Sequence, residues 1–325
     1  MKNMKKLIKV LAVLMLAVAL PFVCGAENAA ENTAAPVRVA ALKGPTGMAI
    51  SHMMAQNDGT YEFTLAGDPT EVNALIISGQ VDIAAVPINA GSVIYNKTQG
   101  GVRALSLITR GMLYVLENGH TVQHVKDLEG KTITTAGQGA TPEYVTRYIL
   151  DTNQINAELD FKSEHAEVTT LAAQGLVDLV LLPEPQVTNL LMKNPSFRVA
   201  LDVTEEFAAA AKQNGQDNAQ LSMSVVIARK ELVENHPEQV AQFMKDLEAS
   251  IAYANENVAD TAQKIAAQGI IPSAAVAEKA LPSCTLVFIA GEDMQAQAAP
   301  LYDILFSANP QSVGGKVPDD TYYLK

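Results

Sequence analysis

The sequence predicts an α/β protein of two similar lobes, each with parallel strands flanked by helices, because one segment occurs twice. Residues 71–87 recur as residues 167–183, with seven identities in 17 positions and no gap. Each copy reads as a short amphipathic helix, a glycine at its end and an apolar run that stops at Pro87 or Pro183. Apolar runs without alternation are typical of strands covered by helices on both faces. The alternative is that both segments are only the helix, glycine and strand units that any α/β protein contains.

Length and composition limit the function classes. The 325 residues, 48% of them hydrophobic, suffice for two domains with full cores. A net charge of −12 and a pI near 4.9 argue against nucleic acid or an anionic membrane surface as the main partner. The chain has no tryptophan and few other aromatic residues, so it lacks obvious stacking platforms for bases or sugars.

The amino terminus has the pattern of a secretory signal peptide. Lysines precede an apolar run over residues 10–23, which is short for a membrane-spanning helix. Cleavage would remove residues 1–26; alternatively Cys24 is the lipidated first residue of a bacterial lipoprotein, although residues 21–23 resemble a lipobox poorly. The polar, alanine-rich residues 27–35 suit a flexible tether in both cases. We therefore expect an exported protein of the periplasm or the cell-envelope surface.

Residues 37–42 predict the first strand, and a glycine-rich turn follows it. Gly44, Thr46 and Gly47 surround Pro45 in this turn, and Thr46 is placed to cap a helix that begins near Gly47. The free N–H groups of a helix start can bind a carboxylate, phosphate or sulfonate oxygen. The turn therefore predicts a ligand-binding segment, the alternative being a strand-to-helix turn that binds nothing.

The first repeated unit follows a second strand, predicted at residues 61–66. Asp68 or Thr70 is expected to cap the next helix; a cap is the default role of Asp68, and contact with a ligand amine is its less favoured role. Asn89 follows the apolar strand at its carboxyl edge, where its amide offers a donor and an acceptor to a bound molecule. Two further strands are predicted at residues 102–109 and 112–117.

The second half repeats this arrangement. A strand leads into a turn with Gln138, Gly139 and Thr141, which is a second helix start suited to an anion. In the second copy of the repeat Glu184 takes the place of Ile88. This carboxylate is either a helix cap or the contact of a positively charged ligand amine.

The carboxyl-terminal third offers fewer signals. Residues 197–203 predict a strand, residues 204–218 a polar connection, and residues 223–229 a buried strand before a long helix that opens at Pro237. The rest reads as alanine-rich helices that cover the first lobe. Cys284 adjoins an apolar run, which favours a buried, inert thiol over a nucleophile.

No catalytic constellation stands out in the sequence. It contains no nucleophile elbow and no Cys or His cluster with metal spacing, so we expect no catalytic residue, no metal and no cofactor. His120 and His124 are four residues apart, but Gly119 and the polar surroundings indicate a surface turn. Asp82 and Asp178 match between the two copies, and hydrogen bonding to local turns is their expected role.

Several segments resemble one group of transport proteins. ALKGPTGMA, GDPTEVNALIISGQVDIAAVP, RGMLYVLENG, VKDLEGKTI and DLVLLPEPQV are similar to the nitrate, sulfonate and thiamine-precursor group of ABC importer solute-binding proteins. The resemblance implies a two-lobed type II periplasmic-binding-protein fold with two hinge crossovers, placed at residues 113–117 and 221–225. Lobe 1 would then comprise residues 36–112 plus 223–325, and lobe 2 residues 113–222.

The resemblance also implies a function. The protein would be a monomer that captures a small anionic or zwitterionic solute in the interlobe cleft and delivers it to membrane permease and ATPase subunits. The missing tryptophans argue against a pyrimidine as that solute. The pocket candidates are Gly44, Thr46, Gly47, Asp68, Asn89, Gln138, Gly139, Thr141 and Glu184.

Two other classes stay open. One is an envelope ligand sensor without a transporter. The other is an enzyme on the same fold, such as the yeast-type thiamine-pyrimidine synthases, whose Cys- and His-rich iron site is absent from this sequence. Permease and ATPase genes beside this one would favour import.

Overall fold

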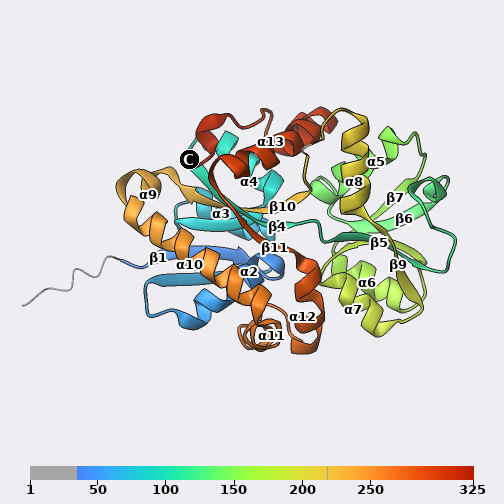
Figure 1. The fold of residues 1–325 in the computed structure, drawn as a ribbon, viewed down its shortest axis with the longest axis horizontal. Helices are drawn as coiled ribbons and strands as arrows, with labels where there is room; N and C mark the ends of the chain where they lie inside the picture. The colour runs from blue at the N-terminus through green and yellow to red at the C-terminus, as the bar shows by residue number, and fades with distance from the viewer. Residues whose placement is uncertain (1–34, 218) are drawn as a thin grey trace, which may run out of the picture. The chain divides into compact units, whose positions relative to one another are not determined.

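The computed structural model describes residues 35–217 and 219–325, and residues 36–325 form one compact unit. The predicted signal peptide, Cys24 and all but the last residue of the predicted tether lie outside the described residues. Within the described part, no helix combines the length and hydropathy that crossing a bilayer requires. Two sheets with helices packed against them form the framework (Figure 1).

The first sheet contains six strands: β1 (Val37–Leu42), β2 (Tyr61–Ala66), β3 (Ile83–Pro87), β4 (Val102–Arg110), β10 (Ser222–Arg229) and β11 (Leu286–Ile289). Their order is β2, β1, β3, β10, β4 and β11. β1, β2 and β3 run parallel, and β10 is antiparallel to both β3 and β4. The carboxyl ends of β1, β3 and β4 therefore lie at the same edge of the sheet.

The second sheet contains five strands: β5 (Leu113–Asn118), β6 (Thr132–Ala136), β7 (Glu158–Lys162), β8 (Leu179–Pro183) and β9 (Phe197–Asp202). Their order is β7, β6, β8, β5 and β9, with β6, β7 and β8 parallel and β5 antiparallel to β8 and β9. This order matches β2, β1, β3, β10 and β4 of the first sheet strand by strand. The predicted α/β fold of two similar halves is confirmed.

The helices that connect and cover these strands are α2 (Pro45–Gln56), α3 (Pro69–Ile77), α4 (Ile88–Lys97), α5 (Thr141–Thr152), α6 (His165–Ala173), α7 (Gln186–Lys193), α8 (Val203–Gln213), α9 (Lys230–Asn235), α10 (Pro237–Glu256), α11 (Val258–Ala267), α12 (Ala274–Ala280) and α13 (Gly291–Ala308). Short 3-10 helices also occur: η1 (Val125–Leu128), η2 (Leu281–Cys284), η3 (Pro310–Val313) and η4 (Asp320–Tyr322).

Burial on both faces explains the apolar runs in the repeated segment. Successive side chains of a strand point to opposite faces. In β3, Ala84 and Val86 pack into the core cluster that includes α3, α4 and α13, whereas Ile83 and Ala85 pack against α2 and α10. In Figure 1, α3, α4 and α13 lie on one side of the first sheet, and α2 and α10 lie on the other. β8 is divided between two clusters in the same way. Every position of these strands must therefore be apolar.

The structure corrects three expectations about the chain path. Residues 204–218, expected as a connection, mostly form α8, whose first turn is capped by Asp202. The segment after α12, expected to be wholly helical, includes β11. The first passage between the sheets occurs at Gly111 and Met112, because residues 113–117 already belong to β5. The lobe boundaries themselves remain a prediction.

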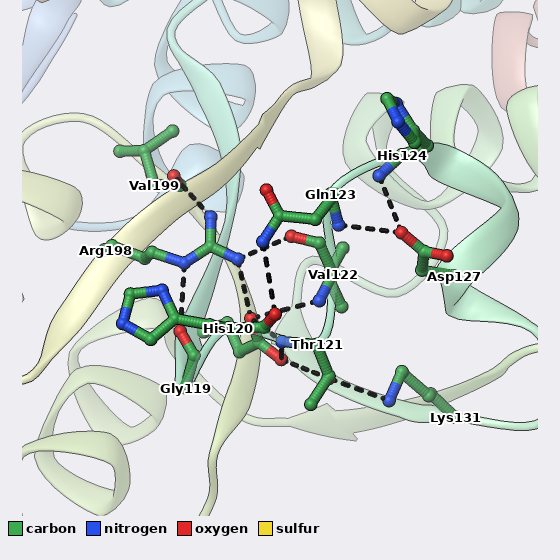
Figure 2. Close-up of polar contacts among 11 residues, drawn as sticks. Gly119, His120, Thr121, Val122, Gln123, His124, Asp127, Lys131, Arg198 and Val199 are labelled. Atoms are coloured by element: carbon green, nitrogen blue, oxygen red, sulfur yellow. Dashed lines mark hydrogen bonds and ion pairs between the residues drawn. The ribbon is translucent and has the colours of Figure 1, made fainter.

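An ion pair between the buried Glu117 and the partly buried Arg198 holds the segment between β5 and β6 (Figure 2). Glu117 is 5% exposed and accepts hydrogen bonds from the backbone N–H groups of Thr121 and Val122 at 3.0 and 3.2 Å. Arg198 donates to Glu117 Oε2 and to the carbonyl of Gly119, both at 2.9 Å, and to the carbonyl of Val122 at 2.5 Å. Because the two charges compensate each other, we assign this cluster a structural role.

Candidate functional site

The turns at the carboxyl edges of the two sheets contain the residues predicted to bind a ligand. In the first sheet these turns follow β1, β2 and β3, and in the second sheet they follow β6 and β8. In open α/β sheets, ligands bind at this edge. The structure shows which of the predicted side chains already form hydrogen bonds within the protein.

The turn after β1 differs from the prediction. α2 begins at Pro45 with Gly44 as its N-cap, and no side chain caps it. Thr46 Oγ1 instead donates to the Leu42 carbonyl at 2.9 Å and accepts from the Leu42 N–H at 3.1 Å. A Cβ on the buried Gly47 would lie 2.9 Å from the Leu42 oxygen. The predicted cap by Thr46 is therefore wrong, because its hydroxyl closes the turn.

Asp68 has the capping role that the sequence favoured. It is exposed, precedes α3, and its Oδ1 accepts a 2.6 Å hydrogen bond from the Thr70 N–H. The hydrogen bonds from Thr70 lower the pKa of this carboxyl group. A ligand contact by Asp68 remains a prediction.

Asn89 and Thr141 are brought together, although they belong to turns of different sheets. Asn89 lies in the first turn of α4 and is 9% exposed, and Thr141 is the first residue of α5 and is 2% exposed. Thr141 Oγ1 donates to Asn89 Oδ1 at 3.3 Å. Asn89 Nδ2 donates a long hydrogen bond of 3.5 Å to the Ser312 carbonyl. Two polar groups that were predicted independently therefore meet at one point.

Gln138 and Gly139 lie on a groove of about 720 Å³ between α5 and α13. The Gly139 N–H donates to Glu143 Oε2 at 2.7 Å, so this amide is already used. Asn309 at the end of α13 donates a 3.0 Å hydrogen bond to the Tyr144 hydroxyl. The groove is lined by Gln138, Gly139, Glu143, Tyr144, Arg147, Tyr148, Asp151, Asn214, Gln216, Ile304, Ser307, Ala308 and Asn309.

Glu184 is the one acidic residue of the predicted pocket that is buried. It is 4% exposed and accepts hydrogen bonds from the Thr188 N–H and Thr188 Oγ1, both at 3.1 Å. Burial raises the pKa of this carboxyl group, although the bonds from Thr188 act in the opposite direction. Its position at the start of α7 fits the predicted interaction with the helix, and a ligand contact remains a prediction.

Arg110 and Ser222 are neighbouring polar residues that the sequence analysis did not single out. They are register partners at the end of β4 and the start of β10. Arg110 donates through its terminal nitrogen to Gln297 of α13, but its buried Nε has no partner within the described structure. The hydroxyl of Ser222, which is fully buried, also has no hydrogen-bond partner there. A basic residue directly after the strand predicted at residues 102–109 was the available signal.

His165 also has a buried polar atom without a hydrogen-bond partner in the described structure. It is the first residue of α6, and its Nε2 would lie 3.7 Å from a Cβ built on Gly137, in the turn after β6. Its buried Nδ1 has no partner among the described residues. Burial lowers the pKa of His165 to about 4, so the imidazole is neutral at physiological pH.

The matched aspartates of the repeat are used by the fold. Asp82 accepts from Arg38 Nε at 2.9 Å and forms an ion pair with that guanidinium. Asp178 Oδ1 accepts a 2.9 Å hydrogen bond from Asn118 Nδ2.

Cys284 is fully buried, and burial raises the pKa of its thiol. Across residues 35–217 and 219–325, no group of three or more His, Cys, Asp or Glu residues is arranged to hold a metal ion.

Comparisons with known proteins agree with this architecture. A family model described as NMT1/THI5 like matches residues 62–260. An ABC transporter protein from Parabacteroides distasonis has a similar structure, with a TM-score of 0.75, 21% identity, and coverage of 90% of this chain and 99% of that chain. The periplasmic aliphatic sulphonate binding protein SsuA from Escherichia coli follows with a TM-score of 0.68, 14% identity, and coverage of 90% and 92%.

A third similar structure is that of a protein with a bound molecule. The alkanesulfonate-binding protein SsuA from Xanthomonas axonopodis pv. citri, bound to MOPS, has a TM-score of 0.65, 14% identity, and coverage of 88% of this chain and 95% of that chain. At these identities the similarity establishes the fold. No curated protein sequence matches the chain.

Proposed function

This chain belongs to the NMT1/THI5-like family, and from this premise we propose that it is the extracytoplasmic solute-binding component of an ABC importer. The solute is a small anionic or zwitterionic molecule held between the two lobes. A membrane permease with its ATPase subunits receives the solute. The protein works in the periplasm or at the cell-envelope surface as a monomer and catalyses no reaction.

The observation that carries this proposal is the hydrogen bond between Asn89 and Thr141. It joins the first turn of α4, which follows β3, to the start of α5, which follows β6. Polar groups at equivalent edges of two sheets therefore face each other, as a molecule held between two lobes requires. Hinge closure of two domains around a ligand is a common mechanism of binding proteins.

The fold relatives support the same proposal. Two of them are sulfonate-binding proteins according to their descriptions, and the full length of each is nearly covered by this chain. A sulfonate has three oxygens that accept hydrogen bonds from helix-start N–H groups. Alkanesulfonates are therefore the first solutes to test, before nitrate, amino acids and thiamine precursors.

The proposal is tested with the exported protein purified from cells. Mass spectrometry of the material released on unfolding should identify a small molecule, and that molecule should raise the melting temperature of the refolded protein. A ligand present at 100 times its Kd stabilises a protein by about 2.7 kcal/mol, which thermal unfolding readily detects. Absence of any released molecule, together with no stabilisation by the sulfonate, nitrate, amino acid and pyrimidine panel, would contradict the proposal.

A further inference from the structure

We infer that Arg110, together with Ser222, binds the acidic group of the solute. The inference rests on the proposed function and deepens it, because it names the chemical class as a carboxylate, sulfonate or phosphonate. It also places the recognition residue in the first sheet, beside the connection to the second sheet.

The position of Arg110 suits a ligand held between the lobes. It ends β4, at the same edge as the carboxyl ends of β1 and β3. Directly after it, the Gly111 N–H donates to the Leu221 carbonyl at 2.7 Å, so the two passages between the sheets touch at this point. Arg110 and Ser222 stand on either side of this contact.

The other arginines show how this protein uses guanidinium groups in the fold. Four of the six form ion pairs with carboxylates: Arg38, Arg147, Arg198 and Arg229. Arg198 is the fullest example, since it bonds Glu117 and the carbonyls of Gly119, Val122 and Val199 (Figure 2). Arg103 donates to the carbonyls of Gly100 and Val102 at 2.8 and 2.9 Å.

Arg110 departs from this pattern. It forms no ion pair within residues 35–217 and 219–325, and its side-chain partner there is the neutral amide of Gln297. Burial lowers its pKa, and no carboxylate acts in the opposite direction. Arg110 is partly buried, with its Nε fully buried, and a charge in such a place without a counter-charge is costly. An acidic solute would supply the missing counter-charge.

The chemistry of the pair defines the ligand group. A guanidinium offers parallel N–H donors whose spacing matches two oxygens of a carboxylate, sulfonate or phosphonate. The buried hydroxyl of Ser222 can donate to a further oxygen of the same group. A neutral amide or alcohol cannot compensate the charge.

The test compares Arg110→Met with Arg103→Met, a change at the opposite end of the same strand. The probes are matched pairs of acidic and neutral molecules: propanesulfonate and propanesulfonamide, hexanoate and hexanamide, propylphosphonate and its diethyl ester, and any molecule released from the purified protein. Affinities are measured by calorimetry. We expect only acidic probes to bind, with at least tenfold weaker binding to Arg110→Met and unchanged binding to Arg103→Met.

A stability measurement separates recognition from a structural role. Arg110→Met should keep or raise the melting temperature of the ligand-free protein, because it removes a partly buried charge that has no counter-charge. Arg110→Lys keeps the charge and loses the paired donors, so it should bind the acidic probes with intermediate affinity. It replaces Arg110→Met in the test if Arg110→Met does not fold.

The possible outcomes distinguish this inference from the proposed function. Binding of a neutral probe only, or equal affinity of Arg110→Met and the wild type, overturns the role of Arg110 and leaves solute binding intact. No released molecule and no bound probe overturns both.

Discussion

Thr141 Oγ1 lies 3.3 Å from Asn89 Oδ1, although the two residues are 52 positions apart and follow strands of different sheets. Both side chains are buried, so this contact is largely shielded from solvent. Hydrogen bonds of this kind each contribute about 1 kcal/mol. If closure of the lobes holds the solute, this bond forms part of the closed state.

The first prediction concerns this bond. Thr141→Val removes the donor while keeping the shape, and solute affinity should fall about fivefold, which corresponds to about 1 kcal/mol. Thr146→Val is the matched control, because Thr146 is buried in the same helix and its hydroxyl bonds to the Pro142 carbonyl within that helix. Calorimetry on both variants decides the matter. If Thr141→Val and Thr146→Val bound the solute with equal affinity, the hydrogen bond between Thr141 and Asn89 would not contribute to the bound state.

The second prediction concerns the ion pair of Glu117 and Arg198. Arg198→Met leaves the Glu117 carboxylate buried without its counter-charge, so the free energy of unfolding should fall by about 3–5 kcal/mol. Arg147→Met breaks a pair with Glu143 in which the Arg147 side chain is exposed, and it should cost less than about 1 kcal/mol. Urea unfolding measures both changes. Similar costs for the two variants would mean that the Glu117 pair is not buried in solution.

The third prediction is the pH dependence of the same cluster. Burial raises the pKa of Glu117, but the hydrogen bonds from Thr121 and Val122 and the charge of Arg198 together lower it below its usual value. A carboxyl group with a lowered folded-state pKa stabilises the fold above its unfolded-state pKa, which is about 4.3, and this contribution is lost as the pH falls through the folded-state value. Glu117→Gln should therefore be less stable than the wild type at pH 7. The difference should shrink below about pH 4, and a difference that stays constant down to pH 2.5 contradicts the prediction.

The fourth prediction concerns Glu184, for which the sign is reversed. Burial raises its pKa, so the folded protein retains this proton at a pH where the unfolded chain has lost it. Wild-type stability should fall as the pH rises through that folded-state pKa. Glu184→Gln keeps an acceptor for the Thr188 N–H and removes this dependence. Thermal unfolding from pH 4 to 8 should show the variant gaining stability over the wild type with rising pH.

The fifth prediction concerns the connection between the sheets. Gly111 has a φ of +58°, and a Cβ there would lie 2.5 Å from Thr204 Oγ1. Gly130 has a similar φ of +69°, but nothing lies within 4 Å of its Cβ position. Gly130→Ala should cost about 1–2 kcal/mol from backbone strain, and Gly111→Ala should cost about 1–3 kcal/mol more because of crowding. Equal melting temperatures would show that Thr204 moves away at no cost.

Much of the framework was predictable because it depends on local patterns. The runs of β3 and β8 are apolar at every position, since both faces of each strand are covered. The capping role of Asp68 could be predicted because its partner, Thr70, is two residues away. α8 was missed because its alanine-rich, polar sequence resembles a connection, and its cap, Asp202, stood inside a predicted strand.

The site was less predictable because it depends on contacts that are distant in sequence. Thr46 has the right residue type for a cap, but its hydroxyl bonds to Leu42. Arg110 follows the strand predicted at residues 102–109, and its residue type alone does not distinguish a binding role from a structural one. Its lack of a carboxylate partner depends on neighbours such as Gln297, which is 187 positions away. Sequence spacing does not report which polar groups the fold leaves unsatisfied.

The placement of β10 between β3 and β4 affects the order in which this protein can be assembled. A growing chain displays β3 and β4 more than a hundred residues before it displays the strand that joins them. During that interval the first sheet cannot be completed, and we expect the emerging polypeptide to stay loosely structured. Export from the cytoplasm, which the proposed function requires, would benefit from such a delay, since the last third of the sequence must arrive before the fold becomes rigid.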